Sequence, residues 1–477
     1  MGCYLVTALW GDWHTRVFTE MNLRTLLAER NLPLFAREVR CTYLVYTRAT
    51  DAGWIASSAA WQALARIMPV HIEVLPDSAF TNPIDTHVAI WHAGADRARN
   101  DGAYMLTIPA DFAWADGAFA TIAGHLAAGK RAIYYMCIRV VHETFAEDFA
   151  AAARPGELAV RFTPRQLMAL TMRHLHPLHA AYTRDCAHFA HHMEYSIWPV
   201  EGEGFIMRLL VGSVLCYDPR RFDLDPKFSL AQAESVEDVA VIDDSDDMYS
   251  VSLTPLLKDR NWYFTRRRTD PDEVGGWWLQ YDGAFQWPLA QRWLRFHTGD
   301  MTPDAWRRVG RQSDFFVVQA LLAREMIRIG RVMAGIGLHK AADCLAVALY
   351  GNRLRRRWTW RGPVTVFCPV DDAFAVLGGL ESLLAEEGQD ALFALVKAHV
   401  ALGPVELPVL PDEGGAFAGH GTVTSLADDV LPVTVEGGTT RVGGCRVLDR
   451  LHLPHGNTLY VIDGLLGRAA APPTAAQ

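Results

Sequence analysis

The residues with the clearest capacity for chemistry are the acids that follow a short apolar run at residues 239–242. Residues 243–247 read DDSDD. Four carboxylates within five residues repel one another, so a bound cation or solvent must stabilise them. We expect Asp244 and Asp246 to act as metal ligands before their neighbours. The alternative is a solvated acidic turn, because charge clusters are usually exposed.

A second acidic position follows an apolar run at residues 104–108. A segment of small residues precedes Gly102, the apolar run comes next, and Asp111 lies just beyond it. In α/β sheets, ligands bind outside the carboxyl ends of the strands. Asp111 is therefore predicted to face a ligand, and the alternative is that it caps a loop or a helix. Asp116 and Gly117 follow and begin the next helical pattern.

Histidines and arginines form two further clusters. Residues 174–179 contain three histidines, and His188 and His191 have the spacing of one helical face. Neutral imidazole binds zinc or manganese, but no H-E-x-x-H frame is present, so a structural role is favoured. His176, just before a proline, is the one expected to face a cleft. Arginines interleave with aromatic residues at 260–268, a pattern that can clamp a diphosphate, but the solvated end of a strand is the favoured interpretation.

Length, charge and cysteine content limit the class of protein. A chain of 477 residues exceeds one typical core, so two or three domains are expected. The net charge of −9 argues against a nucleic-acid partner. Eight scattered cysteines fit free thiols in a reducing compartment. Without a signal-like start or a transmembrane run, the prediction is a cytoplasmic protein.

The elements that must position these residues alternate between strand and helix. Strand patterns occupy residues 3–9, 41–47, 70–75, 104–108 and 131–141, with helical patterns between several of them. This alternation predicts a three-layer α/β fold around a mainly parallel sheet. Further along, residues 142–192 are predicted helical, 194–217 a hairpin that turns at 201–204, and 288–350 helical again.

The segment from residue 93 to residue 117 resembles the nucleotide-sugar-binding half of GT-A glycosyltransferases, especially the family 2 type. In that family a strand delivers an Asp-x-Asp to the site. The resemblance implies a nucleotide-sugar donor, a divalent cation such as Mn²⁺ or Mg²⁺, and transfer of a sugar to a carbohydrate, lipid or protein acceptor. Here Pro109 stands in place of the first acid and leaves Asp111 alone. A scaffold that has lost catalysis is therefore the rival hypothesis.

The same resemblance assigns roles to individual residues. Asp111 and Asp116 would lie near the donor, and Asp111 near any metal. The end of the first strand would contact the nucleobase, where Thr7 could hydrogen-bond and Trp10 could stack. The acidic turn would supply a second acidic element, with Asp244 or Asp246 as a base or late metal ligand. A core strand with a buried tryptophan is the alternative for residues 7–10.

Two segments near the C-terminus share a pattern. Residues 365–374 read TVFCPVDDAF and residues 459–466 read LYVIDGLL, with His399 between them. They resemble the two signature boxes of fasciclin-like domains, which implies a β-rich α+β module that binds a protein or glycan partner. We therefore expect a GT-A-like domain at 1–265, a helical connector at 266–355, a linker at 353–362, a fasciclin-like domain at 360–467 and a disordered tail at 468–477. The chain is also compatible with a homo-oligomer.

Overall fold

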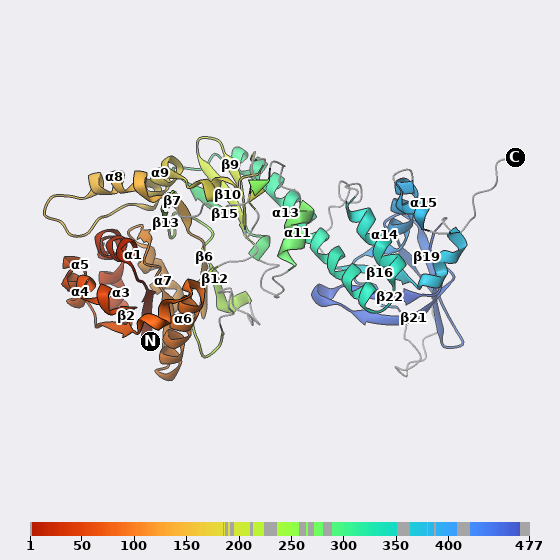
Figure 1. Cartoon of the computed structure of the whole chain (residues 1–477). Helices are drawn as coiled ribbons and strands as arrows, with labels where there is room; N and C mark the ends of the chain where they lie inside the picture. Colours follow the sequence, from red (N-terminus) through yellow and green to blue (C-terminus); the bar gives the residue numbers. More distant parts are fainter. Residues whose placement is uncertain are drawn as a thin grey trace. The chain divides into compact units, whose positions relative to one another are not determined.

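The structure, a computed structural model, describes thirteen segments of the chain: 2–184, 186, 189–190, 195–209, 213–223, 236–256, 264–265, 271–279, 289–350, 363–378, 380–385, 388–407 and 420–467. It divides into two units (Figure 1). Unit 1 comprises Met1–Thr269 and Tyr281–Asp314, and unit 2 comprises Asp270–Gln280 and Phe315–Gln477. Some sequence predictions lie outside the described residues: His188, His191, Arg260, Arg266, Arg267, Arg268, the linker at 353–362 and the tail at 468–477.

Unit 1 is built on a seven-stranded sheet with the order β12-β6-β11-β4-β1-β2-β3. The strands are β1 (Gly2–Ala8), β2 (Arg40–Arg48), β3 (Val70–Leu75), β4 (Tyr104–Thr107), β6 (Ala132–Tyr135), β11 (Ser213–Tyr217) and β12 (Val239–Val241). All neighbouring pairs are parallel except those of β11, which is antiparallel to both β4 and β6. The predicted mainly parallel sheet is confirmed.

Helices cover both faces of this sheet. They are α1 (Asp12–Val17), a π-helical turn (Phe18–Asn22), α2 (Leu23–Leu26), α3 (Leu32–Glu38), α4 (Ala49–Ser57), α5 (Ala59–Ala65), a 3-10 turn (Asp77–Phe80), α6 (Pro83–Asn100) and α7 (Ala118–Ala127). Alternate residues of β1 point to opposite faces. Leu5 packs in the cluster that contains α2, α3, α5 and α7, and Val6 packs with Ile90 of α6. At Gly94, α6 comes so close to β1 that a Cβ would lie 2.9 Å from Val6 Cγ2.

Two smaller sheets complete the core of unit 1. One has the order β5-β13-β7 and the other β15-β10-β9. Their strands are β5 (Phe112–Trp114), β7 (Ile138–Val141), β13 (Ser250–Thr254), β9 (Tyr195–Val200), β10 (Gly204–Leu209) and β15 (Leu294–His297). The predicted turn at 201–204 joins β9 to β10, which pair antiparallel. The remaining elements are α8 (His142–Ala152), α9 (Pro164–His174), α10 (Pro177–Ala180), a 3-10 turn (Val236–Asp238) and the two-stranded pair β8 (Phe189–Ala190) and β14 (Phe264–Thr265).

Three predictions of secondary structure are wrong. Residues 142–192 were expected to be helical, but residues 153–163 separate α8 from α9 and residues 189–190 form the strand β8. Residues 131–141 were expected to form one strand, but they form β6 and β7, which belong to different sheets. Apart from the exposed Arg139 both strands are buried, so the sequence is apolar on both sides of the break at residues 136–137 and gives no sign of it. The segment from 288 was expected to be helical throughout, yet it contains β15, whose Leu294 and Phe296 are buried while Arg295 between them is half-buried.

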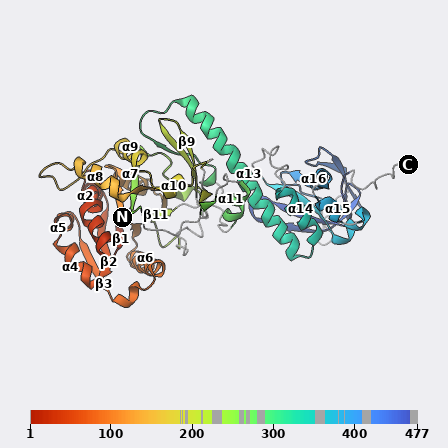
Figure 2. The ribbon, with the colours of Figure 1, turned by 45° about the horizontal axis from the view of Figure 1, so that its top comes forward.

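Unit 2 combines helices with a second seven-stranded sheet (Figure 2). Its strand order is β17-β16-β22-β21-β20-β19-β18. The strands are β16 (Val364–Pro369), β17 (Val400–Leu402), β18 (His420–Thr424), β19 (Val430–Glu436), β20 (Thr439–Val442), β21 (Cys445–His452) and β22 (Thr458–Ile462). The helical elements are α11 (Pro271–Trp278), α13 (Pro303–Gly335), of which residues 315–335 belong to unit 2, α14 (His339–Tyr350), α15 (Glu381–Leu384), α16 (Gln389–Ala398) and 3-10 turns at Asp371–Leu377 and Pro454–Gly456.

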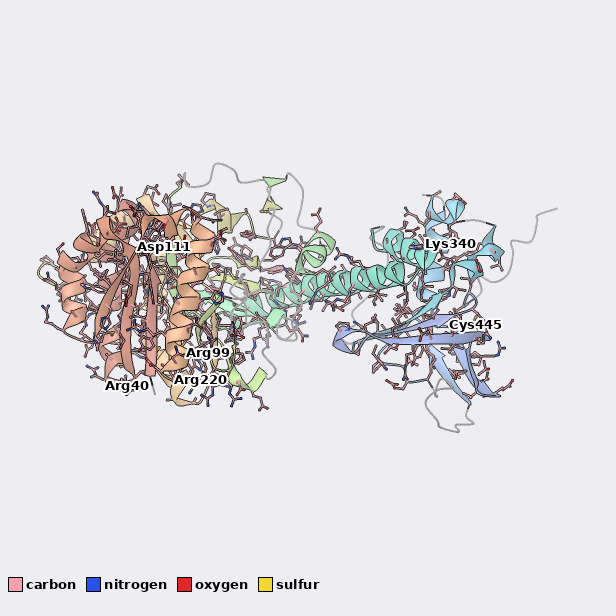
Figure 3. The ribbon with its side chains drawn as sticks, turned by 60° about the horizontal axis from the view of Figure 1, so that its bottom comes forward. Arg40, Arg99, Asp111, Arg220, Lys340 and Cys445 are labelled. Carbon is pink, nitrogen blue, oxygen red and sulfur yellow. The ribbon has the colours of Figure 1, made fainter. Side chains whose placement is uncertain are left out.

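The two C-terminal boxes lie side by side in this sheet. Strands β16 and β22 pair in parallel, and the rings of Phe367 and Tyr460 stack 5.8 Å apart. The start of α14 is tied to the turn after β16, because the Lys340 N–H donates to Asp371 Oδ1 at 2.9 Å. Figure 3 labels Lys340 in this unit. Helix α14 is therefore part of the same core as both boxes.

All eight cysteines are free thiols, and five of them are buried. Among the described residues, no helix combines the length and apolar character needed to cross a membrane.

Candidate functional site

Two groups of polar residues lie beyond the carboxyl ends of strands in the central sheet of unit 1. Asp111 follows β4, and Asp244 follows β12. Because β12 runs parallel to β6, and β11 is antiparallel to both β6 and β4, these two strands end at the same edge of the sheet. Figure 3 shows Asp111 at the end of the sheet opposite Arg40, which begins β2. This is the edge where α/β sheets bind ligands.

Asp111 is held by the middle strand of the β5-β13-β7 sheet. Its Oδ2 accepts a hydrogen bond from Ser252 Oγ at 3.1 Å, and its carbonyl accepts one from the Leu253 N–H at 2.7 Å. The side chain is half-buried. Since Ser252 is itself buried, it fixes the direction of the carboxylate.

Arg139 projects from β7 beside this carboxylate. It lies opposite Ser252 in the register of β7 and β13, and its Nη1 donates to Thr254 Oγ1 at 3.3 Å. The side chain is exposed. Burial by surrounding protein acts to lower the pKa of Arg139, but Tyr195, Cys137 and Asp111 outweigh it and leave that pKa raised. Arg139 therefore carries its charge while its side chain stays accessible to solvent.

The histidines of α10 support this strand. His179 Nδ1 accepts from the Arg139 N–H at 3.3 Å, and its Nε2 lies 2.8 Å from the Tyr195 hydroxyl. Burial and then the nearby Arg139 charge hold the pKa of His179 well below its usual range, so this imidazole is neutral. His176 caps α10, with Nδ1 accepting from the Leu178 N–H at 3.2 Å. The prediction that His176 faces a cleft is wrong, because its side chain is completely buried.

The residues expected to contact a nucleobase have different surroundings. Thr7 is completely buried, and its Oγ1 lies 2.8 Å from both the Tyr43 hydroxyl and the Ile108 carbonyl oxygen. Thr7 joins β1, β2 and the end of β4. It is therefore a core residue of the sheet, as in the alternative to a nucleobase contact. Trp10 is half-buried after β1, with its ring centroid 5.1 Å from that of Phe80.

Asp116 does not share the surroundings of Asp111. It follows β5 at the opposite end from Asp111, and its Oδ1 accepts from the Arg30 N–H at 3.0 Å. The Asp116 N–H donates to the Phe162 carbonyl at 2.8 Å. Asp116 thus connects loops on the far side of β5.

The second group consists of Asp244, Asp246 and His297, each of which offers a ligand atom within 4.8 Å of the other two. Asp244 Oδ1 lies 2.9 Å from His297 Nε2, and the Asp246 N–H donates to the same carboxylate oxygen at 2.9 Å. Strand β15 brings His297 here, because residue 244 pairs with Arg295 at the edge of that strand. Neither Asp111 nor Asp116 belongs to this group.

Cations of the protein pair with Asp244 and Asp246 of the acidic turn. Arg165 grips Asp246 with Nε and Nη2, at 3.0 and 2.8 Å from Oδ2, and its Nη1 contacts Asp300 at 2.9 Å. Arg295 lies 3.2 Å from Asp244. Burial acts to raise the pKa of Asp244, but hydrogen bonds from His297 and the Asp246 N–H, together with Arg295, leave that pKa lowered. The hydrogen bond to Asp244 raises the pKa of His297 against the opposing effect of burial.

The chemistry of this donor set fits a divalent cation. Carboxylate oxygens suit Mg²⁺ and Mn²⁺. His297 Nε2 donates to Asp244 Oδ1, so this nitrogen would bind a transition metal only after losing its proton. Arg165 donates to Asp246 Oδ2 and would compete with a cation for that carboxylate. His297 was missed at the sequence level because residues 294–297 were expected to be helical, and the only available signal was the Leu-x-Phe alternation.

Comparisons with known proteins identify the C-terminal part of the chain. A family model of the fasciclin domain matches residues 337–468, and the expected start was residue 360. The chain is 34% identical over 152 residues to Protein sll1483 of Synechocystis sp., covering 31% of this chain and 78% of that protein.

A structural comparison returns S. aureus TarS, at 10% identity and a TM-score of 0.26, over 94% of this chain. The chain spans about 62% of the TarS chain. A TM-score this low carries no argument about fold or activity. The assignment rests on the fasciclin match and the Synechocystis relative: the chain belongs to the fasciclin-domain family, through its domain at residues 337–468.

Proposed function

We propose that unit 1 is a divalent-cation-dependent glycosyltransferase that uses a nucleotide-sugar donor. One observation carries the proposal. The Asp244, Asp246 and His297 group lies beyond the carboxyl end of β12, at the sheet edge that also presents Asp111. The resemblance of residues 93–117 to GT-A enzymes supports the choice of substrate class. Asp111 would lie near the donor.

The residues of the group would take different parts in such a reaction. A bound Mn²⁺ or Mg²⁺ would offset the negative charge that grows on the leaving diphosphate. His297 and Arg295 hold Asp244 in one orientation, which suits a ligand. Asp246 is the more exposed carboxylate, with 36% of its side chain accessible, so it would act either as the second metal ligand or as the base that accepts a proton from an acceptor hydroxyl.

Hydrolysis of nucleotide sugars tests this proposal without knowledge of the acceptor. Uridine and guanosine diphosphate sugars should be hydrolysed in Mn²⁺, and EDTA should stop the reaction. The double change Asp244→Asn with Asp246→Asn should abolish hydrolysis while the fold survives. Asp300→Asn is the matched control, because Asp300 contacts the same Arg165 but lies outside the ligand group. Full hydrolysis by the double variant would contradict the assignment.

A catalytically inactive scaffold is the second candidate, and two observations favour it. Pro109 replaces the first acid of the expected pair, and its carbonyl accepts from Asn22 Nδ2 at 2.8 Å. Arg165 also supplies the positive charge that a cation would bring to Asp246. If no nucleotide sugar is hydrolysed and none raises the melting temperature in Mn²⁺, the scaffold is the better description.

For the fasciclin domain, we propose a binding role toward a protein or glycan partner. The domain match at 337–468 supports an interaction module. The protein or glycan partner that the fasciclin domain binds would then be the acceptor for unit 1 or a neighbour of that acceptor. Pull-down with residues 1–336 in parallel with the full chain would test this, since a partner of the fasciclin domain should be retained by the full chain only.

A further inference from the structure

Arg139 differs from most other arginines of unit 1 in its contacts. Among the described residues it forms no ion pair, and the guanidinium donates a single hydrogen bond, to Thr254 Oγ1 at 3.3 Å. Arg48, Arg165 and Arg208, by contrast, each lie within 3.0 Å of a carboxylate. A guanidinium has five N–H donors, so most of the hydrogen-bonding capacity of Arg139 is directed to solvent.

The position of Arg139 allows its unused N–H donors to bind a ligand. The side chain is exposed, and it extends from β7 directly opposite Ser252 of β13, the residue that holds Asp111. The neutral His179 beneath the strand adds no competing charge.

Asp111 completes the arrangement from the other side of Ser252. Its Oδ2 is engaged by Ser252 at 3.1 Å, and its Oδ1 accepts no hydrogen bond from any described residue. Within the described part of the chain, strand β13 therefore lies between a guanidinium with unused donors and a carboxylate with an unused acceptor oxygen. A ligand that carries both an anionic group and hydroxyls matches both.

We propose that Arg139 binds a phosphate of the ligand and that Asp111 accepts a hydrogen bond from one of its hydroxyls. The inference rests on the proposed function and deepens it: the phosphate is that of the nucleoside diphosphate, and the hydroxyl belongs to the attached sugar. A planar guanidinium binds phosphate oxygens in pairs, which fixes orientation as well as charge. This contact is separate from the Asp244, Asp246 and His297 group and needs no metal.

Calorimetric titration of the full-length protein in EDTA tests the proposal. The probes are uridine diphosphate, a uridine diphosphate sugar, pyrophosphate, inorganic phosphate and uridine. Arg139→Met should weaken binding of uridine diphosphate by at least about tenfold, since hydrogen bonds to charged groups are worth 10- to 100-fold in affinity. Arg139→Lys should recover part of that loss, because it keeps the charge without the paired donors. Asp111→Asn should weaken binding of the uridine diphosphate sugar more than binding of uridine diphosphate.

Arg154→Met is the matched control, because Arg154 is exposed and its carboxylate contact, Glu157, lies at 3.7 Å. It should leave binding unchanged. Melting temperatures without ligand show whether each variant folds, and Arg139→Lys keeps the test valid if Arg139→Met does not. Binding by Arg139→Met as tight as by the unaltered protein overturns the inference, as does absence of binding to every probe.

Two outcomes separate this inference from the proposed function. If binding depends on Arg139 but no sugar nucleotide is hydrolysed in Mn²⁺, the phosphate site is supported and the glycosyltransferase proposal is not. Hydrolysis that survives in Arg139→Met keeps the enzyme and removes the phosphate site at Arg139. If pyrophosphate and inorganic phosphate bind as tightly as uridine diphosphate, the anion site stands and its assignment to the nucleotide is overturned in favour of a phosphorylated acceptor.

Discussion

His297 Nε2 and Asp244 Oδ1 lie 2.9 Å apart, although the residues are 53 positions apart in the sequence. The other ring nitrogen, Nδ1, lies 2.7 Å from the Gly299 carbonyl oxygen, so it carries a proton. The histidine is buried and the carboxylate nearly so. The acidic turn is therefore part of the packed structure at Asp244, while Asp246 reaches the surface. This difference within one turn leads to a direct test.

Asp244→Ala should destabilise the protein much more than Asp246→Ala. The first change leaves His297 without its acceptor in a buried place, which costs about 1–3 kcal/mol. The second removes a surface contact with Arg165, and exposed ion pairs contribute about 0.5 kcal/mol. Urea unfolding at neutral pH measures both. Equal losses, or a gain from relieved repulsion in Asp244→Ala, would show that the turn is only a solvated loop.

Arg165 should compete with a cation for Asp246. Its Nη2 lies 2.8 Å from Asp246 Oδ2, so removing the guanidinium frees a carboxylate ligand. Arg165→Met is expected to increase the rise in melting temperature that Mn²⁺ produces, because tighter binding to the native state stabilises it further. Arg161→Met is the control, since its nearest carboxylate, Glu29, is 3.9 Å away. A smaller Mn²⁺ shift in Arg165→Met would argue against the metal group.

Much of the scaffold was predictable because its signals are local. The strands of the central sheet are apolar runs bounded by turn residues, and the helices between them have a regular apolar face. The start of α9 is an example of such a local signal, because the Thr163 side chain accepts from the Gln166 N–H at 3.2 Å and Pro164 is the first helical residue. The two C-terminal boxes led to the fasciclin domain, which the family match confirms.

The site residues were harder to predict because their partners are distant in sequence. Arg139 and His297 are single polar residues in short strands, and nothing nearby marks them. Their roles depend on the register of β7 against β13 and of residue 244 against β15, which only the folded chain sets. The acidic turn was visible as a charge cluster, but its arginine partners come from α9 and β15. Sequence reasoning therefore found the acids and missed the cations that hold them.

Gly275 and Gly276 offer a matched pair in α11 of unit 2. A Cβ at Gly275 would lie 2.3 Å from the Ala320 carbonyl oxygen of α13, whereas at Gly276 the nearest atom, Ile327 Cδ1, is 3.6 Å away. Alanine favours a helix interior over glycine by about 1 kcal/mol at both positions. Gly276→Ala should thus be neutral or stabilising. Gly275→Ala should destabilise by about 1–3 kcal/mol, because backbone must move.

Thermal unfolding of the two glycine variants measures this difference. If both behave alike, helices α11 and α13 do not make the close contact seen at residue 275, and the assignment of residues 270–280 to unit 2 loses its support.

His399 should make the fasciclin domain sensitive to acid. Its Nδ1 donates to the Leu395 carbonyl at 2.8 Å, and its Nε2 accepts from the Leu466 N–H at 2.9 Å, so the neutral ring joins α16 to the second box. Burial lowers the pKa of His399 to about 4, against about 6.5 in an unfolded chain. The unfolded state therefore binds the proton more readily. The stabilisation is fully present above pH 6.5 and is lost as the pH falls toward 4.

The loss should reach about 3 kcal/mol, from roughly 1.4 kcal/mol for each unit between the two pKa values. Unfolding of the C-terminal domain, followed by amide hydrogen exchange in β16 and β22 of the full chain, should show this decline between pH 7 and pH 4. His399→Gln should lower stability at pH 7 and flatten the decline, because glutamine does not titrate. The exposed His452→Gln serves as the control and should keep the full decline. If His399→Gln retains the same pH dependence, other groups cause it, and His399 does not join the two boxes in the way its hydrogen bonds indicate.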